Sequence, residues 1–542
     1  MSSTTSSPRD VIVIGAGFAG LYAVHASRRA GLDVVCFEAG AGVGGTWYFN
    51  QYPGARCDVQ SIDYSYSFDD ELQDEWVWSE RYATQPEILS YMNHVAERFD
   101  LLRDIQLSNA VLSAHFDEER SLWKVATQDG SEHWTRNLVA ATGVLSIPNK
   151  PNIPGIEDFA GEVLFTAQWP AEEPSLAGKR VGLIGTGSSG IQVTPILAAR
   201  AEHLTVFQRT PNWSVPAFNR PYTDEDQKEI REGYPERRRK SRVSGGGSTF
   251  VTHSKRGVDC TPEEAREVLE QSWRSGGTLF AKAFPDQMSD LAANDIARTF
   301  AEEKIRERIN DPEVARKLIP DHPLGAKRIV TDSHYFETFN RDNVDLVSLR
   351  EDPISSVAPW GIKTKDSSYE VDVLVFATGF DAVTGALARI DLRGVDGIPL
   401  SEVWSEGPKA YLGIFVPSFP NLFLINGPDS PGVLANMVMH SELQFDWVLD
   451  LIQEASARGA QTVEARSDVT EKWTEHVDEL ANATVFVTTD SWYLGSNIEG
   501  KPRKFMIYTG GLGTYMEVCR GVAEREYEGL VFTSREQSSQ LA

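Results

Sequence analysis

The hydrophobic pattern of the chain opens with a short apolar run that leads into closely spaced glycines. Residues 11–14 are rich in β-branched side chains, which predicts a buried parallel strand. Small and apolar residues then follow with helical spacing, and a second strand is expected over 33–37. The same order returns with a strand at 181–184, a glycine turn, a helix and a strand ending at 206–207. Two such units predict an α/β fold with parallel sheets.

The first glycine turn has the spacing of a dinucleotide-binding motif. Gly15, Gly17 and Gly20 would provide a tight turn, close backbone approach to a pyrophosphate, and close packing of helix on strand. Glu38 ends the second strand, where a carboxylate bonds ribose hydroxyls. A glycine pattern alone is weak evidence, but strand, helix, strand and acid in this order favour FAD, whose ribose is not phosphorylated.

The second glycine turn carries a cation where the first unit has its acid. Arg209 follows the strand at the position of Glu38, and a guanidinium there can pair with the 2′-phosphate of NADPH. A solvated surface arginine is the alternative. The residues expected to bind NADPH at this turn are Gly185, Thr186, Gly187, Gly190, Arg209 and Thr210.

Two dinucleotide units in one chain imply hydride transfer between two cofactors, because nicotinamide and flavin must meet. Two further apolar segments, 136–143 and 371–381, each run into Ala-Thr-Gly. Each predicts a strand that ends in a glycine turn close to a cofactor. We expect the chain to cross between domains at these two places.

Length, charge and cysteine usage narrow the class of protein. A chain of 542 residues suggests two or three domains. Its net charge of -26 disfavours nucleic acid and anionic membranes as partners. The four cysteines are far apart and form no CxxC pair, which argues against a metal site and favours a reducing, cytoplasmic location. No export signal or transmembrane span is evident.

A basic run, ERRRKSR at 236–242, lies in a charged, helix-patterned region. Such a run could contact nucleic acid. Three glycines follow it and acidic residues flank it, so a solvated helix end is the favoured interpretation.

Several motifs resemble a known family, the flavin-dependent Baeyer–Villiger monooxygenases, which are related to the flavin-containing monooxygenases. Residues 44–47 (GGTW), 52–54 (YPG) and Asp58 match the family's motif after the first glycine turn. The segment FAGEVLFTAQWP at 159–170 is similar to its second motif, and Trp169 favours the ketone-oxidising branch. The resemblance covers nearly the whole chain. The loop at 427–440 is most similar to the phenylacetone monooxygenase group.

The resemblance implies two Rossmann-like domains with an inserted helical subdomain. The FAD-binding domain would be discontinuous, formed by residues 1–145 and 380–542. The NADP-binding domain would take 150–220 and 325–378, and the helical insert 221–323.

The activity that the resemblance implies is oxidation of a hydrophobic ketone to an ester or lactone by NADPH and O2, with sulfoxidation as a second activity. An FAD C4a-peroxide would attack the carbonyl carbon. Arg328 is expected to stabilise this anionic oxygen, because a guanidinium never loses its charge, and Asp58 to tune the arginine. Without the motif, a turn-forming aspartate and an exposed cation would be the simpler interpretation.

Further site residues follow from the same resemblance. Lys327 would bind the 2′-phosphate with Arg209, and Trp492 would pack against NADP+. The residues expected to contact FAD after the first turn are Gly45, Thr46, Trp47, Asp58 and Arg328. The expected pocket, largely apolar, comprises Val144, Leu145, Pro431, Leu434, Asn436 and Met437.

Two residues depart from the family pattern. Phe165 stands where the family has a histidine that couples domain movement, so either apolar packing replaces a polar contact or coupling is impaired. Asp429 stands where glycine is usual, either in the pocket or in a left-handed turn. The rival functions are oxidation of sulfur or nitrogen, and an uncoupled NADPH oxidase or redox sensor. The oligomeric state is not readable, and a monomer is compatible with the sequence.

Overall fold

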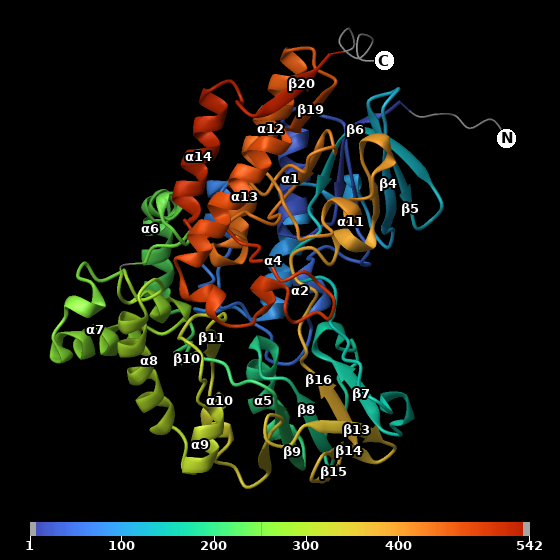
Figure 1. Cartoon of the computed structure of the whole chain (residues 1–542). Helices are drawn as coiled ribbons and strands as arrows, with labels where there is room; N and C mark the ends of the chain where they lie inside the picture. The colour runs from blue at the N-terminus through green and yellow to red at the C-terminus, as the bar shows by residue number, and fades with distance from the viewer. Residues whose placement is uncertain (1–6, 251, 535–542) are drawn as a thin grey trace.

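The computed structural model describes residues 7–250 and 252–534, which form two lobes around two largely parallel sheets (Figure 1). The upper lobe in this view holds an eight-stranded sheet of order β17–β4–β5–β6–β1–β2–β3, with β18 beside β6. Its strands are β1 (Arg9–Ile14), β2 (Val34–Phe37), β3 (Ile105–Gln106), β4 (Val111–Asp117), β5 (Leu122–Thr127), β6 (Glu132–Ala140), β17 (Asp391–Arg393) and β18 (Leu422–Leu424).

Helices from both ends of the chain cover the upper sheet. The first helix, α1 (Phe18–Arg29), packs beside the long α12 (Met437–Ala457) and shares one apolar core with it. The other helices of this lobe are α2 (Thr46–Phe49), α3 (Asp70–Glu75), α4 (Gln85–Arg98), α11 (Leu400–Val403), α13 (Ser467–Asn482) and α14 (Leu512–Glu524). A small antiparallel pair, β19 (Thr462–Ala465) and β20 (Leu530–Thr533), lies near their far end (Figure 1).

The lower lobe is built on a five-stranded sheet that is parallel throughout, in the order β12–β9–β8–β16–β7. These strands are β7 (Glu162–Phe165), β8 (Arg180–Ile184), β9 (His203–Gln208), β12 (Val344–Ser348) and β16 (Val373–Phe376). Around them lie α5 (Ser188–Arg200), α10 (Tyr335–Thr338), the parallel pair β10 (Ser214–Pro216) and β11 (Val330–Asp332), and the antiparallel β13 (Ile354–Ala358), β14 (Gly361–Thr364) and β15 (Ser368–Glu370).

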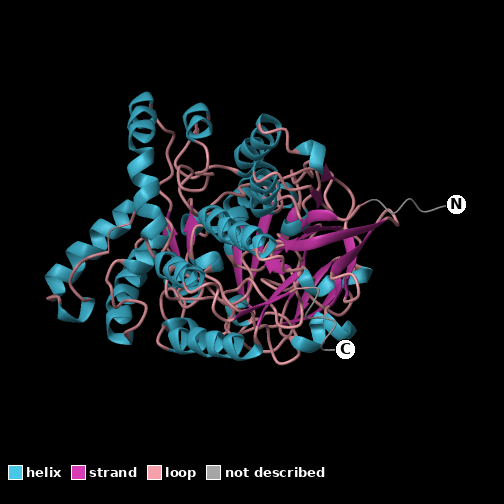
Figure 2. Cartoon of the chain, turned by 90° about the horizontal axis from the view of Figure 1, so that it is seen from above, coloured by secondary structure: helices cyan, strands magenta, loops and turns pink. Residues whose placement is uncertain are grey.

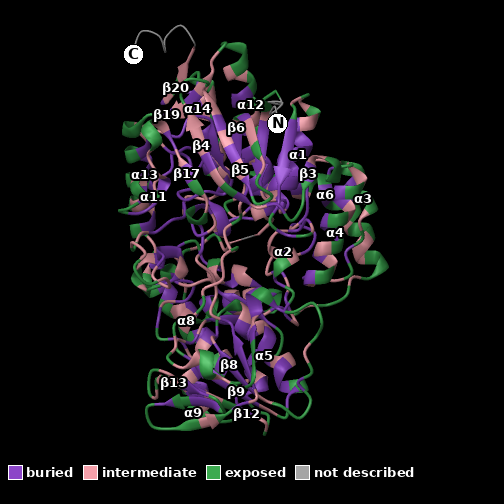
Figure 3. Ribbon diagram, turned by 90° about the vertical axis from the view of Figure 1, so that its right-hand side faces the viewer, coloured by how far each residue is buried: buried purple, intermediate pink, exposed green. Residues whose placement is uncertain are grey.

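The central strands of both sheets are buried, and Figure 3 shows them largely purple. The central strands β8 and β16 contain apolar residues in succession, as parallel strands covered on both faces require. The predicted α/β class with two Rossmann-like units is therefore confirmed.

A group of helices lies beside the two sheets, at the left of Figure 1 and outside the magenta strands of Figure 2. They are α6 (Asp224–Val243), α7 (Pro262–Ser275), α8 (Leu291–Arg306) and α9 (Pro312–Leu318). Among the described residues, no helix is both long and apolar enough to span a membrane.

The basic run at 236–242 corrects one expectation, because two of its arginines are not solvated. Arg237 pairs with Asp63, with Nη2 2.5 Å from Oδ2. Arg238 is 5% exposed and donates to Gln73 and to the Ser65 hydroxyl at 2.7 Å. Arg239 and Lys240 behave as expected, because both are exposed and paired with Glu236 on their own helix. The run therefore fastens α6 onto the upper lobe, a role that its sequence surroundings do not reveal.

Candidate functional site

The first glycine turn joins β1 to α1 and leaves no room for a side chain at Gly15 or Gly20. Gly15 has φ +99, and a Cβ on Gly20 would lie 1.7 Å from the Gly15 carbonyl oxygen. The helix can therefore start directly against the turn only because Gly20 has no side chain. A Cβ on Gly17 would have its nearest neighbour, Gly45, at 3.6 Å, so this glycine borders open space.

The segment containing Gly45, Thr46 and Trp47 lies directly on this turn. The Gly44 N–H donates to the Ala16 carbonyl at 3.0 Å, and Gly45, at φ +52, precedes the short helix α2. Trp47 is buried, and its indole N–H donates to the Tyr64 hydroxyl at 3.2 Å. Gly17 and Gly45 thus stand side by side, each directly before a helix start that has no side-chain cap, and this arrangement leaves a cradle that a pyrophosphate fits.

The carboxylate of Glu38 lies against the same turn. Its carboxylate accepts from the Ala16 N–H at 2.6 Å and from the Gly40 N–H at 2.7 Å, and the residue is 4% exposed. Burial raises the pKa of this carboxyl. The acid and the glycines that the sequence singles out therefore share one location, at the carboxyl ends of β1 and β2.

The second glycine turn repeats this geometry between β8 and α5. Gly185 has φ +111, and a Cβ on Gly190 would lie 2.1 Å from the Gly185 carbonyl oxygen. Around Gly187, by contrast, a Cβ would meet nothing within 4 Å. The Thr186 hydroxyl donates to the Thr210 carbonyl at 3.0 Å and so ties the turn to the end of β9.

Each Ala-Thr-Gly segment lies against one of these turns. A Cβ on Gly15 would lie 2.6 Å from the Ala141 carbonyl oxygen, and one on Gly185 would lie 2.4 Å from that of Ala377. The chain that follows the first segment pairs with the second segment: the Asn149 N–H donates to the Gly379 carbonyl at 2.8 Å. The two crossings between the lobes thus run side by side as a short ribbon.

Arg209 and Lys327 form a cationic pair at the end of β9. Arg209 is exposed and Lys327 half-buried, and neither has a hydrogen bond or ion pair within residues 7–250 and 252–534. Burial, then the charges of Arg209 and Arg350, lower the pKa of Lys327. Arg350 itself is paired with Asp321 at 2.7 Å. Asp490 and Asp321 act on Lys327 only from a distance, and like charges held together without an ion-paired carboxylate favour an anionic ligand.

Arg328 points away from that pair and binds Asp58. Its Nε and Nη2 each lie 2.8 Å from one carboxylate oxygen of Asp58, and Nη1 donates to the Val433 carbonyl. Burial opposes the charge, but the Asp58 carboxylate holds the pKa of Arg328 above its ordinary value. The guanidinium thus joins three segments: Asp58 from the upper lobe, the strand leading into β11, and the 430–437 loop.

An apolar cluster lies beside this arginine. It gathers Val144 and Leu145 after the first crossing, Leu434 and Met437 from the loop, and Trp492. The Trp492 ring is half-buried, with its centroid 4.3 Å from that of Tyr493. The other members of the cluster are Ala382, Val383, Val433, Ala481, Phe486, Val487, Tyr493, Leu494, Phe505, Met506, Ile507 and Met288.

Two of the expected pocket residues have structural contacts instead. Asn436 is 2% exposed, caps α12 by accepting from the Val438 N–H at 3.1 Å, and donates to the Asp63 carbonyl at 2.6 Å. Pro431 is buried and begins the turn Gly432–Leu434. We therefore leave both out of the pocket proposed below.

Asp429 is in a left-handed turn beneath the loop. Its φ is +67 and its exposure 0%. The carboxylate accepts from the Thr474 hydroxyl at 3.1 Å and lies 3.3 Å from the Lys504 ammonium. Burial raises its pKa to about 6, and Lys504 opposes that shift. The residue is a buried brace between the loop and the 491–507 segment.

Phe165, at the end of β7, is packed between two partners. Its ring stacks on Phe376 with centroids 5.1 Å apart, and the Lys150 ammonium lies 5.4 Å from its centroid. Both partners adjoin the crossings between the lobes. The apolar-packing alternative therefore has contacts that support it.

Two residues near Arg328 escaped the sequence reasoning. Tyr493 is 1% exposed; burial raises the pKa of its phenol, and the nearby Arg328 charge opposes that rise. Lys282, at the end of the turn Thr278–Lys282, is exposed and has no ion pair within the described ranges. Partial burial, then the nearby Arg328, lower its pKa. A tyrosine in an aromatic run and a lone lysine carry no sequence signal of their own.

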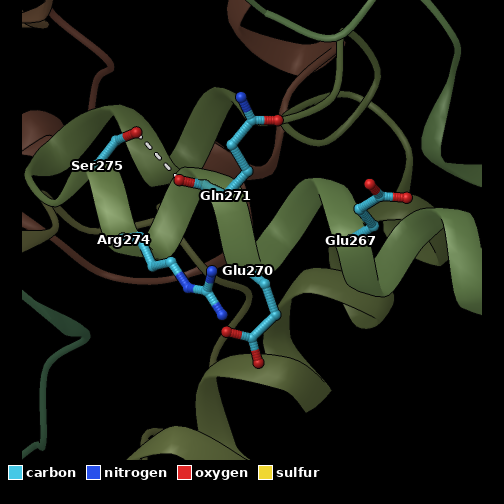
Figure 4. Close-up of a pocket in the computed structure, with 5 residues that line it drawn as sticks. All are labelled: Glu267, Glu270, Gln271, Arg274 and Ser275. Carbon is cyan, nitrogen blue, oxygen red and sulfur yellow. Dashed lines mark hydrogen bonds between the residues drawn. The ribbon is translucent and has the colours of Figure 1, made fainter.

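A separate depression lies on the helical insert and contains none of these residues. Five side chains of α7 line it, with the Ser275 hydroxyl donating to the Gln271 carbonyl at 3.0 Å (Figure 4). The other three are Glu267, Glu270 and Arg274. Because a single helix face forms it, we do not consider it a site.

Comparisons with known proteins agree with this geometry. The family model described as flavin-binding monooxygenase-like matches residues 8–223. A Baeyer-Villiger monooxygenase of Pseudooceanicola batsensis is 40% identical, over 98% of this chain and 97% of its own length. Phenazine N-monooxygenase PhzNO1 of Lysobacter antibioticus is 41% identical, over 97% of each chain. A solved oxidized steroid monooxygenase bound to NADP superposes with a TM-score of 0.94 and 52% identity, covering 97% of this chain and all of the other.

Proposed function

The chain belongs to the flavin-dependent Baeyer–Villiger monooxygenases, which use NADPH, O2 and FAD to oxidise ketones to esters or lactones, and on this premise we propose its substrate and site. The substrate is a hydrophobic ketone bound beside Arg328. The observation that carries this proposal is the three-way contact of the Arg328 guanidinium with Asp58 and the Val433 carbonyl, next to an apolar cluster.

The first glycine turn is proposed to hold FAD and the second NADPH. Both turns have glycines whose missing side chains leave a cradle, Gly17 at the first and Gly187 at the second. Bound FAD supplies the oxygen that adds to the ketone. We assign residues 1–145 and 380–542 to the FAD-binding domain and 150–220 and 325–378 to the NADP-binding domain, with 221–323 as the helical insert.

Arg328 is proposed to hold negatively charged oxygen at the reacting centre. Asp58 fixes the plane of the guanidinium and keeps it charged, and two of its five N–H groups remain after the bonds to Asp58 and Val433. Those N–H groups can donate to oxygen without any proton transfer, because arginine does not titrate near neutral pH. Arg209 and Lys327 would bind the 2′-phosphate of NADPH on the other side of the segment.

The pocket is proposed to consist of Val144, Leu145, Leu434 and Met437, with Trp492 packed against the nicotinamide nucleotide. Aliphatic and thioether side chains on two segments suit an apolar ketone. Asp429 presents no carboxylate to the pocket surface, because it is buried beneath the loop.

Oxidation of nitrogen or sulfur is the second candidate, and one observation favours it: a relative of 41% identity is a phenazine N-monooxygenase. The test is NADPH consumption by the FAD-loaded protein with phenylacetone, cyclohexanone and methyl phenyl sulfide, with product and peroxide both measured. Ester or lactone matching most of the NADPH supports the ketone proposal. Product from the sulfide alone would support the second candidate, and peroxide alone would indicate an uncoupled oxidase.

We also propose a cytoplasmic location and no nucleic-acid partner. The four cysteines, all within the described residues, are unpaired, as expected in a reducing compartment. The basic run that suggested nucleic acid is occupied with contacts inside the protein.

A further inference from the structure

Tyr493 is held rigidly beside the proposed reacting centre. It lies between Trp492 and Leu494 in a short turn, and its carbonyl accepts from the Met506 N–H at 3.1 Å. Aromatic rings surround it, with centroids 4.3 Å away at Trp492 and 5.6 Å away at Phe486. A ring packed in this way has one orientation, so its hydroxyl has a fixed position.

The hydroxyl group of Tyr493 has no hydrogen-bond partner within residues 7–250 and 252–534, although the residue is only 1% exposed. Arg328 lies near enough for its charge to oppose the rise in the pKa of the phenol that burial causes. Because Arg328 offers only N–H donors, the O–H hydrogen needs an acceptor other than Arg328. A polar group without a partner on a largely buried residue is the usual mark of a group that serves a ligand.

The same residue belongs to the apolar cluster that we propose as the pocket. Tyr493 and Val433 are fully buried members, and Leu434 and Met437 pack against them. Val433 also accepts from Arg328 through its carbonyl. The unused O–H and the remaining Arg328 N–H groups therefore lie at the same edge of the pocket.

We propose that Tyr493 is a catalytic hydrogen-bond donor that acts with Arg328 on the carbonyl oxygen of the bound ketone. The proposal rests on the assignment of Arg328 to the reacting centre. As oxygen adds to the carbonyl carbon, the π electron pair of C=O moves onto the ketone oxygen, and two donors stabilise the charge. When the carbon migrates to the added oxygen, that pair re-forms the C=O of the ester, the O–O bond to the oxygen donor breaks, and its electron pair leaves with the departing oxygen.

No proton needs to leave Tyr493 in this sequence. Burial raises the pKa of its phenol to about 12, with Arg328 opposing the shift, so the phenol stays protonated at neutral pH. It therefore donates a hydrogen bond throughout and is not a general acid. This distinguishes it from a group whose titration would shape the pH profile.

The test is the carbonyl stretching frequency of phenylacetone bound to the oxidised holoenzyme with NADP+, measured by infrared difference spectroscopy in wild type, Tyr493→Phe and Tyr508→Phe. Tyr508 is the matched control: it is 2% exposed, follows the same segment and stacks on Trp473 at 5.3 Å. We expect a higher frequency in Tyr493→Phe alone, because one hydrogen bond is lost. Ester formation should fall on the order of 100-fold, as for loss of one donor to a developing oxyanion.

Other readouts separate this role from a structural one. FAD content and the KM for NADPH should stay unchanged in Tyr493→Phe, since Asp58 still orients Arg328. A wild-type carbonyl frequency in Tyr493→Phe overturns the proposal. If Arg328→Lys shifts the frequency and Tyr493→Phe does not, only the role of Tyr493 is lost. If neither variant shifts it, the assignment of Arg328 is wrong as well.

Discussion

Replacing Arg209 or Lys327 should weaken NADPH binding and leave NADH binding nearly unchanged. The two cations are close enough for Arg209 to lower the pKa of Lys327, and neither is neutralised by a carboxylate in the described ranges. In the free protein they repel each other. A phosphate between them would remove this repulsion and add hydrogen bonds. NADH, which lacks the 2′-phosphate, gains neither.

The expected size follows from the exposure of the two side chains. A hydrogen bond to a charged group contributes roughly 1.5–3 kcal/mol. Arg209 is exposed, so its removal should cost near the lower limit, about tenfold in affinity at 1.4 kcal/mol per decade. Lys327 is half-buried, and its removal should cost near the upper limit, about 100-fold. The two effects should not be additive, because the two cations lie close enough for the Arg209 charge to act on Lys327.

The assay is NADPH and NADH oxidation by Arg209→Ala, Lys327→Ala and the double variant, with KM determined for each nucleotide. Arg350→Ala is the matched control, since it removes a cation from the same region that is already paired with Asp321. Its effect on the NADPH to NADH ratio should be small. An Arg209→Ala protein with the wild-type ratio would refute the assignment of the pair to the 2′-phosphate.

The same pair predicts a pH effect with a definite sign. Because the pKa of Lys327 is lowered in the free protein and an anion raises it, binding of NADP+ should take up protons at alkaline pH. Calorimetric titrations in buffers of different ionisation enthalpy measure this uptake. Binding of NAD+ should show none, and proton release on binding NADP+ would contradict the reasoning.

Three further outcomes are expected from residues around the site. The pKa of Asp429 is about 6 in the folded protein and 3.8 for an ordinary aspartate. The folded state therefore holds the proton more tightly, and the free energy of unfolding should fall as pH rises from 3.8 to about 6. At 1.36 kcal/mol per pKa unit, the fall is about 3 kcal/mol. The melting temperature of Asp429→Asn, relative to wild type, should therefore rise over this window and then level off; a constant difference would contradict the assignment. Lys282→Gln should lower kcat/KM for a carboxylate-bearing ketone roughly two- to fivefold, the value of an exposed charge pair, and leave its neutral analogue unaffected. Phe165→His should destabilise the protein by about 1–2 kcal/mol through loss of the Phe376 and Lys150 contacts, measurable by urea unfolding. A gain in ester per NADPH in Phe165→His would instead indicate impaired coupling in the wild type.

The glycine turns were predictable because their geometry is set within a few residues. Gly20 must lack a side chain because its Cβ would lie 1.7 Å from Gly15, only five positions earlier. The strand, turn and helix pattern of one short segment is therefore enough to predict the dinucleotide-binding turn. The end of each strand, with Glu38 in one unit and Arg209 in the other, is positioned by the same local order.

The contacts that fasten the site together were not predictable, because their partners are distant in the sequence. Arg238 bonds Gln73 across 165 positions, and Asp429 faces Lys504 across 75. From the sequence alone a basic run is expected to be solvated, because the buried acceptors that bind it come from distant segments of the chain. The sequence alone leaves open whether Asp429 lines a pocket or forms a left-handed turn, because only the folded structure shows the side chains around it.

Phe165 shows how the two kinds of information combine. Within its motif, phenylalanine signals only the loss of a titratable, hydrogen-bonding side chain. In the fold its ring has two faces to fill, and Phe376 covers one while Lys150 lies over the ring. Both partners adjoin the ribbon where Asn149 and Gly379 join the crossings. A histidine there would lose aromatic packing and, when protonated, repel the Lys150 ammonium. The substitution is thus matched to its neighbours, and the ribbon between the lobes is stabilised by packing at this point.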